Sequence, residues 1–250
     1  MKAPQRDMMA ASPPVGLSIV SHGQGDLVNN LLHSLDKHCQ GFPVSIVLTL
    51  NIDEKTDWLT PNPSFPLTVI KNHRPRGFGA NHNTAFKSLG NTDYFCVMNP
   101  DIVLPANPFP GLISILGKPT IGVVGPALID SQGHLQDSCR KFPTPWRILR
   151  RTLGKKTDYH RQHNLVYPDW IAGMFMLFPS RIFAELGGFD ERYFMYCEDA
   201  DICRRLQKKG LKTAYATDIQ AIHDPRRSSH RNLRHLWWHL NSLLRFFVGV

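Results

Sequence analysis

The sequence predicts an α/β protein whose central sheet is mostly parallel and covered by helices on both faces. Its 250 residues, 42% of them apolar, are enough for one α/β domain of ordinary size. Short, nearly unbroken apolar runs such as Val44–Leu50 and Tyr94–Met98 are typical of strands buried on both faces. Helical patterns such as Leu27–Lys37, where apolar residues recur at the spacing of one helix face, separate these runs.

The first half of the chain is expected to alternate strands and helices. Residues 1–14 are polar and contain prolines, so we expect a flexible lead. Asp26 is the candidate N-cap of the first helix. A second helix is expected around Asn81–Ser88. The expected strands are Val15–Val20, Val44–Leu50, Leu67–Lys71 and Tyr94–Met98.

The second half begins with an expected strand over Ile121–Ile129. Residues 140–164 are basic, weakly periodic and contain two prolines, so we expect a mobile loop there. The apolar segment Trp170–Phe178 is expected to be a buried strand or a sheet edge. Glu198–Lys209 is predicted to be a helix because acids stand at its start, lysines at its end and Gly210 directly after it.

The net charge of +9 is concentrated in two stretches of the chain. Residues 140–164 hold eight basic residues and one acid, and residues 225–250 hold five arginines and no acid. Such local patches indicate a negatively charged partner, which could be nucleic acid, anionic lipid or a phosphorylated substrate. The charge alone does not choose among them.

Cysteine usage and hydropathy indicate the compartment. The five cysteines are odd in number and form no CxxC pair, as expected in a reducing compartment. The N-terminus has no apolar core of signal-peptide length, and no apolar run is long enough to span a bilayer. We therefore predict a cytoplasmic protein, with peripheral attachment to the inner face of the cytoplasmic membrane as an option.

Asn99-Pro100-Asp101 directly follows the strand Tyr94–Met98. Ligands of parallel sheets bind beyond the carboxyl ends of the strands, so these side chains are expected at the binding edge. A carboxylate and an amide oxygen can hold a divalent cation such as Mg²⁺ or Mn²⁺. A plain turn after a strand favours the same residue types.

Acidic residues gather between Asp190 and Asp201. Acids are expected in a first helical turn, where the helix dipole favours each by roughly 0.3–1 kcal/mol, and this explains one or two of them. Glu198, Asp199 and Asp201 together, beside an apolar segment, are crowded for stability alone. Neighbouring like charges raise at least one carboxyl pKa, which is what a general base near neutral pH requires.

A glycine-containing loop and a late histidine complete the candidate features. In Arg76-Gly77-Phe78-Gly79-Ala80-Asn81, backbone N–H groups at a helix start can approach a phosphate or sugar, although a loop that needs positive φ would show the same glycines. His223 follows the apolar run Ile219–Ile222. It would serve as a metal ligand only if the fold brings Asp101 beside it.

Taken in order, these motifs resemble the family 2 glycosyltransferases of the GT-A fold, in particular bacterial rhamnosyltransferase-like members that build surface polysaccharide. The resemblance covers about Leu17 to Phe247, and its specificity lies in the joint order and spacing of the motifs. They are the opening strand, Arg76–Asn81 with Asn83, Asn99-Pro100-Asp101, Trp170-Ile171-Ala172-Gly173, Gly187-Gly188-Phe189-Asp190-Glu191 with Phe194-Met195-Tyr196, Glu198-Asp199-Ala200-Asp201, and His223.

The resemblance implies a role for each matching residue near the reaction. Asp101 matches the last acid of the family's DxD-type motif, which holds the divalent cation on the donor diphosphate, and Asn99 occupies its variable first position. Asp199 matches the catalytic base, with Glu198 beside it. His223 matches a histidine that completes the metal site in some members.

The resemblance also assigns residues to the donor and the acceptor. Gly77, Phe78, Gly79 and Asn81 match donor-site residues. Trp170 to Gly173 lie where the acceptor sugar packs, and Asp190 and Glu191 are assigned to the acceptor. The family commonly has Asp-Asn at the end of its second strand, but this chain has Leu50-Asn51. Asn51 is kept as a donor-site residue, and Asp53 is the candidate substitute for the missing acid.

The implied activity is an inverting, metal-dependent transfer of a sugar from a nucleoside diphosphate sugar, dTDP-rhamnose being one option, to a glycan or lipid-linked acceptor. Residues 15–250 would form one domain, with a nucleotide-sugar half over 15–130 and an acceptor half over 165–250. A basic nucleic-acid-binding protein and an inactive sugar-binding domain are the alternatives. No nucleic acid is expected as partner, because zinc-finger spacing, an RRM signature and basic heptads are all missing.

The C-terminal stretch has apolar residues at helical spacing from Leu233 to Phe247, with arginines elsewhere on the wheel. Such a helix could lie on an anionic membrane surface, where a lipid-linked acceptor would be found. It could equally pack on the catalytic domain or form a homodimer contact.

Overall fold

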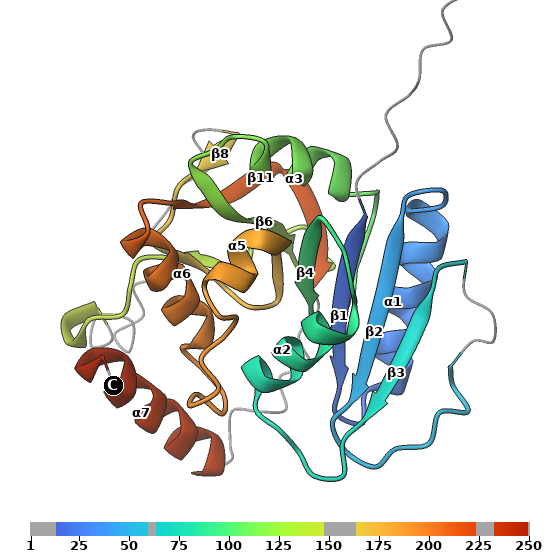
Figure 1. Ribbon diagram of the computed structural model, residues 1–250, viewed down its shortest axis with the longest axis horizontal. Helices are drawn as coiled ribbons and strands as arrows, with labels where there is room; N and C mark the ends of the chain where they lie inside the picture. Colours follow the sequence, from blue (N-terminus) through green and yellow to red (C-terminus); the bar gives the residue numbers. More distant parts are fainter. Residues whose placement is uncertain (1–13, 60–63, 148–163, 224–232, 250) are drawn as a thin grey trace, which may run out of the picture.

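The computed structural model describes residues 14–59, 64–147, 164–223 and 233–249, and it confirms the predicted α/β architecture (Figure 1). A nine-stranded sheet has the order β3-β2-β1-β4-β10-β6-β11-β5, with β8 paired to β11, and β7 and β9 form a separate two-stranded sheet. The strands are β1 (Val15–Ser21), β2 (Val44–Leu50), β3 (Leu67–Lys71), β4 (Tyr94–Met98), β5 (Ile102–Val103), β6 (Ile121–Ile129), β7 (Cys139–Arg140), β8 (Leu165–Val166), β9 (Trp170–Ile171), β10 (Phe175–Pro179) and β11 (Lys212–His223). The helices are α1 (Gly25–His38), α2 (Phe78–Ser88), α3 (Phe109–Leu116), α5 (Ser180–Glu185), α6 (Glu198–Lys208) and α7 (Leu233–Val248).

The direction of the strands determines where their carboxyl ends lie. Strands β3, β2, β1 and β4 are parallel, and so are β6 and β11. Strand β10 is antiparallel to both β4 and β6, with Phe175 opposite Met98 and Leu177 opposite Val124. The carboxyl ends of β4, β6 and β11 and the amino end of β10 therefore lie at one edge of the sheet.

Side chains of β4 show how the sheet is covered on both faces. Cys96 and Met98 belong to a core cluster with residues of α1 and α3, whereas Phe95 and Val97 belong to a second cluster with residues of α5 and α6. Successive side chains of a strand point to opposite faces, so an unbroken apolar strand requires a hydrophobic layer on each side. The prediction that nearly unbroken apolar strands are buried on both faces of the sheet is therefore confirmed for β4.

The structure corrects three details of the sequence-based expectation. Helix α1 begins at Gly25 after Gln24 without a side-chain cap, so Asp26 is not the N-cap but a residue of the first turn. Helix α2 begins at Phe78 rather than Asn81. The segment Trp170–Phe178 is not one strand, because it divides between β9 and β10, which belong to different sheets. Most of the basic stretch 140–164 lies outside the described residues.

Among the described residues, no helix combines the length and the hydropathy that crossing a bilayer requires.

Candidate active site

Asp101 and His223 lie together although 121 positions separate them in the numbering. Asp101 directly precedes β5, and the short β5 pairs with the end of β11 so that Ile102 stands opposite His223. The Nε2 atom of His223 is 3.3 Å from Oδ2 of Asp101. The condition under which His223 could serve as a metal ligand, a position beside Asp101, is therefore met.

Gln136 fixes the orientation of the His223 ring. Its Oε1 lies 2.5 Å from Nδ1 of His223, and its Nε2 donates a hydrogen bond to the backbone carbonyl of the same histidine. With Nδ1 donating to Gln136, a neutral ring of His223 has its lone pair on Nε2, which faces Asp101. Ligating histidines usually have such an outer partner.

The donor set of this cluster fits a divalent cation. Oδ1 of Asp101 is buried and has no hydrogen-bond partner among the described residues, which is costly for a carboxylate oxygen unless something binds it. A carboxylate oxygen and an imidazole nitrogen are both ligands that Mn²⁺ accepts. The described part of the chain does not bring three His, Cys, Asp or Glu side chains together at any point, so further ligands would come from substrate or water.

Asp199 is held at the same edge of the sheet by backbone N–H groups. Its Oδ2 accepts a hydrogen bond of 3.0 Å from Gly173 N, and its Oδ1 accepts one of 2.8 Å from Ala200 N. The residue after Gly173 is Met174, whose carbonyl accepts the N–H of Asn99 at 2.9 Å. Two adjacent backbone residues thus connect Asp199 to the Asn99-Pro100-Asp101 turn.

Burial raises the pKa of Asp199 above its ordinary value. The hydrogen bonds from Gly173 and Ala200 and the positive charge of Arg140 act in the opposite direction. A raised pKa brings a carboxylate closer to the range in which it can accept a proton during a reaction near neutral pH. Asp199 therefore has the electrostatic surroundings expected of a general base.

Glu198 is buried beside Asp199. One of its carboxyl oxygens, Oε2, has no hydrogen-bond partner among the described residues, and burial followed by the charge of Asp199 raises its pKa well above the ordinary value. The two residues before it, Tyr196 and Cys197, have φ of 75° and 66°. Left-handed backbone at consecutive non-glycine residues is costly and concentrates at functional sites.

Asp201 differs from its two acidic neighbours because it is neutralised within the protein. Its oxygens lie 3.0 Å from Nη2 of Arg204 and 2.7 Å from Nε of Arg205. The side chain is almost fully buried. The crowding of acids therefore has two causes. Asp201 orients Arg204 and Arg205, which bond backbone carbonyls of neighbouring segments, whereas Glu198 and Asp199 have no basic partner at hydrogen-bond distance among the described residues.

We expect Asp201→Asn to destabilise the protein by about 2–4 kcal/mol, because it leaves two partly buried guanidinium groups without their counter-charge. Urea unfolding followed by circular dichroism measures this loss. The matched control is Glu185→Gln, whose ion pair with Arg181 is exposed and should contribute at most about 1 kcal/mol. Equal losses in the two variants would show that Asp201 has no such structural role.

The glycine loop packs against the segment that leads to the acidic pair. The N–H of Phe78 donates a hydrogen bond of 2.9 Å to the carbonyl of Phe194. A Cβ at Gly77 would lie 2.8 Å from that same oxygen, and a Cβ at Gly79 would lie 2.6 Å from Cβ of Phe189. A Cβ at Gly173 would lie 2.9 Å from the Phe78 ring. These glycines are explained by close approach between the two halves of the site.

Three asparagines hold the chain that leads into this loop. Asn72 Nδ2 donates hydrogen bonds to Oδ1 of Asn51 and Oδ1 of Asn81, at 2.9 and 2.8 Å. The side chain of Asn51 accepts a hydrogen bond from the backbone N–H of Arg76 and donates one to its carbonyl. The side chain of Asn81 donates a hydrogen bond to the same carbonyl. Asn51 and Asn81 thus use their amides to shape the loop, and Asp53 is exposed just beyond the end of β2.

The residues assigned to the acceptor lie in different surroundings. Trp170 is 9% exposed, and its indole N–H donates to the carbonyl of Lys141 at 3.0 Å, so it forms part of the site's supporting core. Asp190 pairs with Arg192, whose hydrogen bonds lower the pKa of that carboxyl. Glu191 is exposed and accepts a hydrogen bond of 3.1 Å from Asn83.

Sequence reasoning missed two residues of this region. Gln136 belongs to no recognisable sequence motif, because its role depends on contact with His223, which is distant in the sequence. Arg140 counted only as part of a basic stretch, yet in β7 it stands opposite Trp170 with its guanidinium 5.1 Å from the ring centre. Its charge acts on Asp199. The pairing of β7 with β9 has no signal in the sequence.

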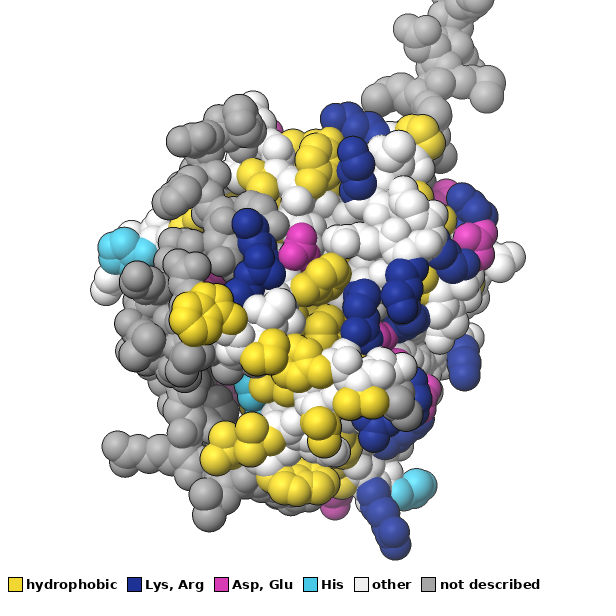
Figure 2. Space-filling view, turned by 90° about the vertical axis from the view of Figure 1, so that its left-hand side faces the viewer, with side chains coloured by type: hydrophobic (Ala, Val, Ile, Leu, Met, Phe, Trp, Pro, Cys, Tyr) yellow, Lys and Arg dark blue, Asp and Glu magenta, His cyan; other side chains and the backbone are white. Residues whose placement is uncertain are grey.

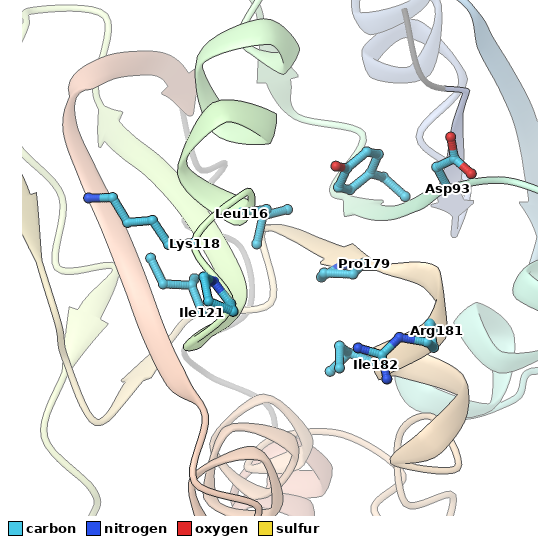
Figure 3. A pocket seen from close by; sticks show the side chains of 9 residues that line it. Asp93, Leu116, Lys118, Ile121, Pro179, Arg181 and Ile182 are labelled. Carbon is cyan, nitrogen blue, oxygen red and sulfur yellow. The ribbon is translucent and has the colours of Figure 1, made fainter.

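A pocket of about 240 Å³ lies at the opposite edge of the sheet, between the starts of β4 and β6 and the end of β10. Asp93, Lys118 and Arg181 line it (Figure 3). None of the predicted site residues borders this pocket. It faces the amino ends of the parallel strands, which is not where sheets of this kind bind their ligands.

The fold is of the GT-A type, because solved glycosyltransferases share it. Among solved structures, the chain resembles a mannosyltransferase from Pyrobaculum calidifontis in complex with GDP-Man and Mn²⁺, with a TM-score of 0.64, 19% identity and coverage of 94% of this chain and 65% of the other. GalNAc-T7 with UDP, GalNAc and Mn²⁺ has a TM-score of 0.68 at 16% identity, covering 88% and 45%. This chain therefore spans less than two thirds of either solved chain.

The chain belongs to glycosyltransferase-like family 2, whose sequence model matches residues 13–236. It is 31% identical to the rhamnosyltransferase WbbL of Escherichia coli, over 94% of this chain and 92% of that protein. It is 30% identical to the N-acetylglucosaminyl-diphospho-decaprenol L-rhamnosyltransferase of Mycobacterium tuberculosis, over 92% and 82%. The predicted family and the glycosyltransferase class are thus confirmed.

Proposed function

We propose that the protein transfers a sugar, with inversion at the anomeric carbon, from a nucleoside diphosphate sugar to an acceptor hydroxyl. The observation that carries this proposal is the link between the two predicted centres. The N–H of Gly173 donates a hydrogen bond to Asp199, and the carbonyl of the next residue, Met174, accepts one from the N–H of Asn99, two positions before Asp101. The proposed base and the proposed cation-binding centre are thus held relative to one another by one short backbone segment.

Asp199 acts as the general base in this proposal. Its carboxylate accepts the proton of the acceptor hydroxyl as that oxygen attacks the anomeric carbon from the face opposite the leaving diphosphate. The N–H groups of Gly173 and Ala200 occupy one lone pair on each oxygen and fix the direction of the others. A positioned base contributes about 10²–10⁴ in rate.

Asp101 and His223 would hold a divalent cation, Mg²⁺ or Mn²⁺, with Asn99 beside them. When bound, such a cation neutralises negative charge on a leaving diphosphate. Asp101 supplies a carboxylate whose Oδ1 has no hydrogen-bond partner in the described part of the chain, and Gln136 keeps Nε2 of His223 directed at the same carboxylate. The glycine loop Gly77–Gly79 and Asn81, with Asn51 and Asp53 near the end of β2, form the proposed donor side.

The names of the relatives suggest the two substrates. Both are rhamnosyltransferases, which supports dTDP-rhamnose as donor and a role in surface polysaccharide synthesis. The mycobacterial relative is named for a diphospho-decaprenol acceptor, which supports a lipid-linked acceptor. Gly173, Asp190 and Glu191 are the proposed acceptor side, with Trp170 as its support. None of the five cysteines forms a disulfide, which supports a reducing, cytoplasmic location.

Thermal-shift measurements with nucleoside diphosphate sugars, each with and without Mn²⁺, test the proposal. A donor that binds the native state raises the melting temperature, and this rise should need Mn²⁺. When the protein is incubated with that donor and a lipid diphosphate sugar, it should then release the nucleoside diphosphate. Binding without turnover would indicate a sugar-binding domain, and retention on DNA that is lost with salt, without nucleotide binding, would indicate a nucleic-acid-binding protein.

A further inference from the structure

Helix α7 presents two different faces. Ser242, Leu243 and Phe246 point inward and are buried. The opposite face carries large apolar side chains that are between 43% and 63% exposed, namely Leu236, Trp237, Leu240, Leu244, Phe247 and Val248. Figure 2 shows hydrophobic side chains gathered over the lower part of this side of the molecule, where α7 runs, with Lys and Arg side chains on the same side. We call the six exposed residues the outer face of α7.

The inner face of α7 contacts the segment 193–197 that leads to Glu198 and Asp199. Ser242 Oγ donates a hydrogen bond of 2.8 Å to the carbonyl of Met195, and the hydroxyl of Tyr196 lies 3.0 Å from Nδ1 of His235. The rings of Phe194 and Trp238 are 4.6 Å apart. The helix is therefore held firmly against the active-site segment, and its outer face is not exposed by fraying.

The positive charge of α7 indicates which kind of partner surface its outer face can contact. The sequence of α7 contains two arginines and two histidines and no acid, and residues 225–250 contain five arginines and no acid. A second copy of the chain would bring two such positive helices together, which is unfavourable. A surface that is both apolar and negatively charged would instead bury the leucines and aromatic rings while neutralising the basic residues.

We propose that the outer face of α7 docks on the interface of a bilayer that contains anionic lipid. Leucine, tryptophan and phenylalanine side chains enter the boundary between headgroups and acyl chains, and the helix lies in the plane of the interface. The docking is carried by α7 itself and does not depend on catalysis. Its consequence, that α7 holds the protein beside a membrane-bound acceptor, rests on the proposed function.

Flotation of the full chain with vesicles tests this proposal. We expect the protein to float with vesicles of phosphatidylcholine and phosphatidylglycerol, and to stay at the bottom of the gradient with phosphatidylcholine alone. The double variant Leu240→Asp with Leu244→Asp should bind the anionic vesicles at least about tenfold more weakly. Leu135→Asp is the matched control, because this leucine is 37% exposed and lies outside α7, and it should float like the parent.

Several results would overturn the proposal. They are failure of the parent chain to float with anionic vesicles, equal flotation with neutral vesicles, and undiminished flotation of the double variant. A stable dimer in gel filtration that the double variant dissociates would assign the outer face to a second copy instead. Nucleotide binding in the thermal-shift assay is independent of flotation, so failure of the docking proposal and failure of the proposed function give different results.

Discussion

Replacement of Asp199 by asparagine is expected to lower the rate of sugar transfer by about 10²–10⁴-fold while nucleotide binding persists. The asparagine side chain keeps the size of the original group but cannot accept the proton of the acceptor hydroxyl. Its amide also places a donor beside the N–H of Gly173 or Ala200, where a carboxylate oxygen now accepts a hydrogen bond. We expect this mismatch to cost about 1–3 kcal/mol of stability.

The rate and the binding are measured separately for this variant. Transfer is followed by nucleoside diphosphate release, donor binding by calorimetry with Mn²⁺, and folding by urea unfolding. Asp218→Asn, which removes an exposed carboxylate of β11, serves as the control and should transfer at the parent rate. Full activity of Asp199→Asn would refute its assignment as base.

The pH dependence of the parent enzyme follows from the same residue. The base must be deprotonated, and burial raises the pKa of Asp199, so activity is present above that raised pKa and is lost as the pH falls through it. The positive charge of Arg140 opposes this rise, and the charge of Asp199 in turn raises the pKa of the buried Glu198. The acid limb of the rate profile should therefore lie above the ordinary range of an aspartate.

Asp101→Ala is expected to give the second large effect, a loss of Mn²⁺ affinity in the protein without substrate. Removal of an outer partner of a metal ligand typically costs 10–100-fold in affinity, and removal of the ligand itself should cost at least about 100-fold. The variant also leaves His223 without the carboxylate that now lies 3.3 Å from its Nε2. Calorimetric titration with Mn²⁺ alone measures this loss without a catalytic assay.

The control for the metal prediction is Asp93→Ala. Asp93 is an exposed carboxylate just before β4, at the edge of the sheet opposite the site, so its removal should leave Mn²⁺ affinity unchanged. Unchanged affinity in Asp101→Ala would contradict the assignment of this residue. A loss of equal size in both variants would indicate nonspecific binding to surface carboxylates.

The acidic residues illustrate how far the sequence could predict the site. The pattern Glu198-Asp199-Ala200-Asp201 indicated that the acids were too many for a helix start, but it could not separate their roles. The helix spacing places Asp201 within reach of Arg204 and Arg205, and this ion-paired cluster could have been anticipated. Asp199 accepts the N–H of Gly173 because of the turn between β9 and β10, a segment for which the sequence predicted a buried strand or a sheet edge.

The sequence by itself determined strands β1, β2, β3, β4 and β6, helices α1, α2, α6 and α7, and the position of the acidic motifs at strand ends and helix starts, because apolar runs and helical patterns of apolar residues are local properties. Only the tertiary structure decided which of these motifs meet. His223 reaches Asp101 because β5 pairs with the far end of β11. Asp199 is linked to Asn99 through Gly173 and Met174, which directly precede β10, the strand that inserts antiparallel between β4 and β6. Strand order and pairing depend on contacts between segments distant in the chain, and no local pattern records them.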